Sequence, residues 1–123
     1  MLPAGAYTTF RTFGKGKVLH LEEHFFRLEE TARLSQSSIQ INREMLRSAL
    51  RTAVGDMPDE NHYRIRLTLD LNLHPGDIYI SIEPLTTPSE AMYLNGVNVV
   101  TRHFQRQNPR AKLTSFIKKA EEM

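Results

Sequence analysis

The chain has 123 residues, of which 40% are hydrophobic and 24% charged, and its formal net charge is +2 at pH 7. These values are typical of one soluble globular domain with a modest core of its own. Interspersed charges exclude a polybasic tail, the lack of any apolar run near ~18 residues excludes a membrane span, and the lack of cysteine excludes disulfide and thiolate chemistry. Without a signal-peptide pattern either, we expect a cytoplasmic protein.

The first third of the sequence predicts a strand, a turn and a helix. Residues 5–13 are rich in β-branched and aromatic side chains, which favour a strand. Residues 14–17 hold two glycines and form the expected turn, and residues 18–21 return as the second arm of a hairpin. From residue 22 to about residue 35 the apolar period becomes helical. The stripe that would pack on the sheet comprises Leu21, Phe25, Leu28 and Ala32.

The middle of the sequence predicts a second helix and an antiparallel pair of strands. Asn42 is a good N-cap and Gly55 a good helix stop, so a helix is expected between them. Residues 62–71 alternate strictly between apolar and polar side chains, and after the Pro75–Asp77 turn residues 78–83 alternate again. Together these elements predict an α+β fold: an antiparallel sheet with two helices on one face.

The last third is predicted with fewer elements. Residues 84–93 are expected to be irregular, and residues 96–102 are expected to form a last strand because of their valines. The polar residues 103–111 are interpreted as a linker. The predicted domain therefore covers residues 1–102, and residues 103–123 form a separate arm.

The sheet face that the helices leave open would carry Arg64 and Arg66, together with Tyr7 and Arg11. Guanidinium and phenol groups suit carboxylates or phosphates, although a solvated sheet face can have the same composition. The five histidines lack the spacing of metal ligands, so no metal site is expected. The sequence has no glycine-rich phosphate loop and no nucleophile elbow.

Three segments resemble the fold-type IV enzymes that depend on pyridoxal phosphate. They are "GAYTTFRT" at residues 5–12, "LEEHFFRLEETARL" at residues 21–34 and "NPRAKLTSFI" at residues 108–117. That family contains branched-chain and D-amino-acid aminotransferases and aminodeoxychorismate lyase. The resemblance implies that Lys112 forms the Schiff base with the cofactor. It also implies that Arg27, the arginine of the family's H-x-x-R-L pattern, binds the cofactor phosphate.

The same resemblance implies residues on the substrate side. Tyr7 matches the aromatic residue of the family's G-x-(Tyr/Phe)-Glu pattern, which lines the substrate pocket, but Thr8 replaces the acidic residue, so substrate specificity cannot be transferred. Arg66 resembles the family's strand arginine, and Arg64 would match after a shift in register; both are candidates for binding a substrate carboxylate. The implied reaction moves an amino group between an amino acid and a 2-oxo acid. Freed Lys112 would act as general base and acid.

The resemblance also implies a larger second domain that begins near the lysine. We therefore expect an N-terminal fragment of a class IV aminotransferase that is not competent alone and that self-associates. Its apolar Leu113, Phe116 and Ile117 would be exposed, disordered or buried against another copy. An aminodeoxychorismate lyase fragment is an alternative, as is a non-enzymatic module for anion binding or oligomerisation. Nucleic acid is not expected as a partner, because Tyr63 falls on the apolar side of its strand.

Overall fold

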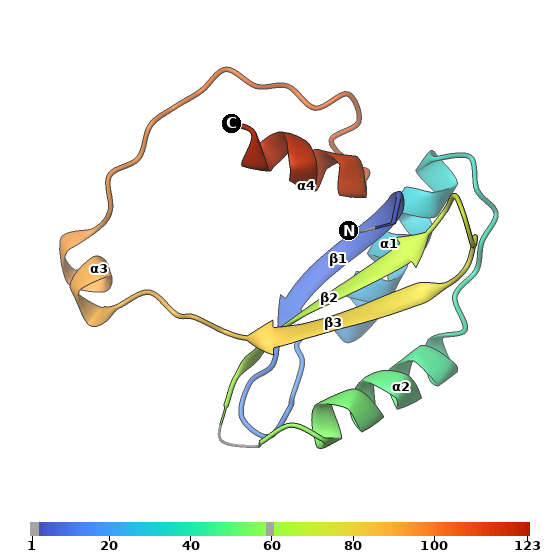
Figure 1. Ribbon diagram of the computed structural model, residues 1–123, viewed down its shortest axis with the longest axis horizontal. Coiled ribbons are helices and arrows are strands. Elements are labelled where there is room, and N and C mark those ends of the chain that lie inside the picture. Colours follow the sequence, from blue (N-terminus) through green and yellow to red (C-terminus); the bar gives the residue numbers. More distant parts are fainter. Residues whose placement is uncertain (1–2, 59–60) are drawn as a thin grey trace.

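The computed structural model describes residues 3–58 and 61–123, in which one strand is followed by two helices, two strands and two more helices (Figure 1). The strands are β1 (Gly5–Arg11), β2 (Tyr63–Asp70) and β3 (Ile78–Pro84), and the helices are α1 (Leu21–Leu34), α2 (Arg43–Gly55), α3 (Glu90–Asn95) and α4 (Thr114–Glu121). Among the described residues, no helix is long and apolar enough to cross a membrane. The α+β class predicted from the sequence is confirmed.

The sheet is antiparallel with the order β1-β2-β3. Tyr7 lies opposite Thr68 and Thr9 lies opposite Arg66, while Thr68 also faces Tyr79 of β3. Successive side chains of a strand point to opposite faces, so this register gathers Tyr7, Arg66 and Thr68 on one face. The alternation predicted for β2 is therefore present in the structure.

The other face of the sheet is the core, and both long helices cover it. Phe25, Leu28 and Ala32 of α1 and Leu46 and Leu50 of α2 are buried against the apolar residues of β1 and β2. The Asn42 side chain accepts a hydrogen bond from the Met45 amide at 3.1 Å, which confirms the expected N-cap of α2. Two helices on one face leave the opposite face of the sheet for other contacts.

Three local predictions were wrong. Residues 18–21 do not form a strand: a bridge between Phe13 and Lys17 closes a short turn, and α1 begins at Leu21. Residues 96–102 are extended but pair with no described strand, because the chain leaves the sheet after β3 and passes through α3 (Figure 1). Residues 90–95 form the short helix α3, although residues 84–93 were expected to be irregular, and residues 114–121 form α4, which lies beside β1.

Gly5 is the point at which the sheet tolerates no side chain. A Cβ atom there would lie 1.9 Å from the Leu69 carbonyl oxygen. Because the obstacle is backbone, Gly5→Ala should lower the free energy of unfolding by about 3 kcal/mol in a denaturant titration. Gly55→Ala is the matched control, since nothing lies within 4 Å of its added Cβ, and it should stay within about 0.5 kcal/mol of the parent. Equal stability of the two variants would contradict this close approach.

Candidate active site

The free edge of β1 is occupied by a segment from the other end of the chain. The Tyr7 amide donates a hydrogen bond to the Lys112 carbonyl oxygen at 2.9 Å, and Ala6 forms a bridge with Leu113. The next residue of the segment, Thr114, accepts a hydrogen bond at its Oγ1 from the Gly5 amide at 3.0 Å. These contacts join Leu113 to the edge of β1 through an isolated bridge, which brings Lys112 beside Tyr7.

Helix α1 fixes the same segment from the core side. The Lys112 amide donates a hydrogen bond to Thr31 Oγ1 at 3.1 Å, and Thr31 is fully buried. At the surface, Arg110 donates to Glu30 of α1 at 2.7 Å. The backbone of Lys112 is thus hydrogen-bonded to β1 on one side and to α1 on the other, so its side chain starts from a fixed position.

Thr31 offers a test of this fixation. Thr31→Val keeps the shape of the side chain but removes the acceptor, which leaves the partly buried Lys112 amide without its partner. We expect a loss of about 1–3 kcal/mol in the free energy of unfolding and faster hydrogen exchange at the Lys112 amide. Thr52→Val is the control, because Thr52 is exposed and its hydroxyl bonds only within α2. Unchanged exchange at Lys112 would show that Thr31 does not hold this segment.

The side chain of Lys112 lies against an aromatic ring on the open sheet face. Its Nζ is 5.5 Å from the centroid of the Tyr7 ring, and Arg66 Cζ is 5.7 Å from the same centroid. The tyrosine ring therefore has two cationic neighbours within cation–π range. Thr68, on the same face, has a buried hydroxyl with no hydrogen-bond partner among the described residues. Around the Tyr7 ring, this face therefore combines the Lys112 amine with the Arg66 guanidinium.

Charge and burial make the Lys112 amine easier to deprotonate. Burial lowers the pKa of Lys112 below its ordinary value, and the positive charges of Arg27 and Arg106 lower it further. A lowered pKa increases the fraction of neutral amine at a given pH, and the neutral amine is the nucleophilic form. Burial and the two arginines therefore act in the same direction on the Lys112 amine.

His24 is a neighbour that the sequence motif contained but to which no role was given. A 2.7 Å hydrogen bond joins its Nδ1 to Thr8 Oγ1, and its ring centroid is 4.8 Å from that of Phe10. Burial lowers the pKa of His24, and the charges of Arg27 and Lys112 lower it further, so the ring is neutral at pH 7. Neutral His24 adds no positive charge beside Lys112, and Thr8 is hydrogen-bonded to it on the core side.

The five residues predicted from the sequence do not all come together. Tyr7, Arg66 and Lys112 share the open face, and Arg27 is an exposed residue of α1 close enough to lower the pKa of Lys112. Arg64 instead forms an ion pair with Glu83 of the neighbouring strand. Arg106 lies outside the three motifs and was therefore not predicted from the sequence. Its guanidinium carbon is 3.7 Å from the centroid of the Phe116 ring.

The structure is a small α+β domain in which Lys112 lies beside Tyr7 and Arg66 on the open face of the sheet. Residues 5–121 match the family described as amino-transferase class IV, so the chain belongs to this family. Family members generally use pyridoxal phosphate. No curated protein matches the chain.

A solved structure shares the fold. The chain is similar to the crystal structure of a protein from Haemophilus somnus 129PT assigned as a 4-amino-4-deoxychorismate lyase, with a TM-score of 0.52 and 15% sequence identity. The match covers 72% of this chain and 44% of that protein. The chain therefore spans less than half the length of this structural relative, and at such low identity the likeness establishes the fold alone.

Proposed function

We propose that this chain supplies the lysine and the substrate-facing sheet of a pyridoxal-phosphate site for amino-group transfer between an amino acid and a 2-oxo acid. The observation that carries the proposal is the position of Lys112, clamped between β1 and α1 with a lowered pKa and directed at Tyr7. Membership of the class IV aminotransferase family supports it. In this reading residues 1–102 are the small domain and residues 103–123 lead into a larger one.

The residues present fit the cofactor in charge and chemistry. The Lys112 amine would hold its aldehyde carbon covalently, and Arg27 would bind its phosphate, because a guanidinium pairs well with phosphate oxygens. Bound pyridoxal phosphate supplies an electron sink for the substrate α-carbon.

The remaining steps would use this chain's own side chains. Arg66 would bind the substrate carboxylate, and the Tyr7 ring would form a wall of the pocket between Arg66 and Lys112. The free Lys112 amine would act as the general base that takes the proton from the substrate α-carbon. The protonated amine would then act as the general acid that returns a proton. Arg64 is the weaker candidate for the carboxylate, because Glu83 already compensates its charge.

Chemical trapping tests the proposal directly. The full 123-residue chain is incubated with pyridoxal phosphate near pH 8, reduced with borohydride and mapped by peptide mass spectrometry. We expect the pyridoxyl group on Lys112 in preference to the exposed Lys118 and Lys119 of the same helix region. Equal labelling of these lysines, or labelling that favours Lys15, would overturn the assignment of Lys112.

The second candidate is a lyase acting on 4-amino-4-deoxychorismate, which the fold of the solved relative keeps open. It would use the same lysine and the same arginines, so labelling does not separate it from a transferase. Product analysis does: a transferase converts an added 2-oxo acid into its amino acid, whereas a lyase consumes 4-amino-4-deoxychorismate without any 2-oxo acid added.

We also propose that copies of the chain self-associate. Val97, Val99 and Val100 are exposed in an extended segment, and β3 is the outer strand of the described sheet. Leu113, Phe116 and Ile117 are half-buried beside β1, so the surface for association would be the valine segment and not the apolar side of α4. Sedimentation velocity should show a concentration-dependent dimer. Val99→Asp should weaken it, and a strict monomer at all concentrations would contradict the proposal.

A further inference from the structure

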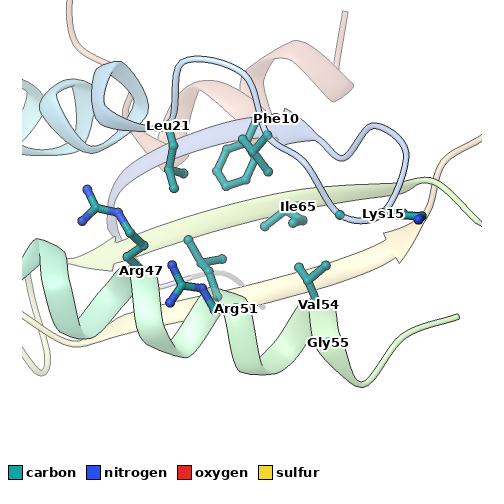
Figure 2. Close-up of a pocket in the computed structure, with 11 residues that line it drawn as sticks. Phe10, Lys15, Leu21, Arg47, Arg51, Val54, Gly55 and Ile65 are labelled. Atoms are coloured by element: carbon teal, nitrogen blue, oxygen red, sulfur yellow. The ribbon is translucent and has the colours of Figure 1, made fainter. Parts of the chain in front are cut away.

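A cavity lies on the core side of the sheet, between α2 and the turn that follows β1 (Figure 2). Its volume is about 340 Å³, which falls within the range of pockets that hold small ligands. Lys112 and the other residues of the candidate active site are absent from its lining.

The floor of the cavity is apolar and is built from four different elements. Its side chains are those of Phe10, Val18, Leu21, Leu50, Val54 and Ile65. Figure 2 shows Phe10 of β1 and Leu21 of α1 on one side, with Ile65 of β2 behind and Val54 of α2 opposite. Water over such a floor has few partners, so an apolar group would gain free energy by displacing it.

The rim of the cavity is cationic. Lys15 lies on the turn after β1, and Arg47 and Arg51 lie one helical turn apart on α2 (Figure 2). Arg47 is paired with Glu22, but within residues 3–58 and 61–123 no carboxylate forms an ion pair with Lys15 or Arg51. Figure 2 shows Arg47 and Arg51 toward one end of the cavity and Lys15 toward the other, so the apolar floor has a cationic group at each end.

The turn that carries Lys15 has a left-handed backbone conformation at two successive residues. Lys15 has φ 58° and Gly16 has φ 72°, both in the left-handed region that costs a lysine conformational energy. A Cβ atom on Gly16 would lie 2.7 Å from Val54 Cγ1, so the turn contacts α2 closely without filling the space between them. The strained turn thus holds Lys15 at the rim and leaves the cavity open.

From this geometry we infer a binding site for a small amphiphilic anion, a carboxylate with a compact apolar body. The apolar body would occupy the floor and the carboxylate would bind Arg51 at the rim, which matches the hydrophobic lining and the cationic rim. The site is independent of the proposed function, because it lies on the opposite side of the sheet from Tyr7 and Lys112.

A pair of matched probes tests the inference. The isotope-labelled full chain is titrated with 3-phenylpropionate and, separately, with the neutral 3-phenylpropanamide, while the amide and methyl shifts are followed by NMR. We expect the carboxylate to shift Val18, Leu50 and Val54 with a Kd near or below about 1 mM, and the neutral amide to bind about tenfold more weakly. Arg51→Gln should remove this preference, whereas Arg102→Gln, at an exposed position away from the cavity, should keep it.

Three outcomes would overturn the inference. Equal affinity for the two probes would show that charge does not recognise the ligand. Shifts confined to Tyr7 and Lys112 would place the anion at the candidate active site. Concentration-dependent shifts of Val18, Leu50 and Val54 without any probe would show that a second copy of the chain occupies the cavity. The first two outcomes are measured on the parent chain alone. The test therefore does not depend on whether the Arg51→Gln variant folds.

Discussion

Replacing Lys112 by alanine should abolish the pyridoxyl adduct at this position and, in any preparation of the protein that turns over an amino acid, lower the rate by about 10²–10⁴-fold. The physical reason is that the amine is the group that both attaches to the cofactor and moves the α-proton in the proposed site. The peptide map after borohydride reduction measures the first effect, and steady-state kinetics measure the second.

Two further variants separate chemistry from folding. Lys112→Arg keeps a positive charge beside Tyr7 and leaves the backbone hydrogen bonds to Tyr7 and Thr31 in place, yet it cannot form the adduct. It should therefore unfold at nearly the parent temperature while losing the label. Lys118→Ala, at an exposed position of α4, should keep both label and rate. A Lys112→Ala protein that retains full activity would refute the role proposed for this residue.

Arg27→Gln should shift the pH dependence of labelling at Lys112 to higher pH. The positive charge of Arg27 is one cause of the lowered pKa of Lys112, so its removal lets that pKa rise towards the ordinary value and reduces the neutral amine at a given pH. The pKa of His24 should rise for the same reason, which NMR titration of its ring can follow independently. The two shifts have the same sign because both groups are cationic when protonated.

The same variant also tests phosphate binding. If Arg27 holds the phosphate, the parent should prefer pyridoxal phosphate over pyridoxal, which lacks the phosphate, by about tenfold or more, and Arg27→Gln should lose this preference. Arg102→Gln removes one exposed arginine elsewhere and should change neither the pH profile nor the preference. Identical behaviour of the two variants would mean that Arg27 acts only through the net charge of the protein.

Local patterns in the sequence were sufficient for the regular part of the fold. The alternation along β2, the apolar stripe of α1 and the Asn42 cap of α2 each depend on residues within one element, and the structure contains all three. The failures fall where partners are distant. Residues 96–102 have the composition of a strand, but a strand needs an edge to pair with, and the chain has left the sheet by then. The short helix α3 falls where residues 84–93 were expected to be irregular.

The candidate site divides in the same way. Sequence motifs named Lys112, Arg27, Tyr7 and Arg66, since each belongs to a short pattern with its own spacing. Only the tertiary structure decided that Lys112 pairs with the edge of β1, that its pKa is lowered by burial and by Arg27, and that Arg64 is neutralised by Glu83. Burial and charge neighbours are properties of the folded chain, because they depend on residues that are far apart in sequence and adjacent in space. The cationic cavity between α2 and the turn after β1 arises for the same reason, from side chains of separate elements that no local pattern connects.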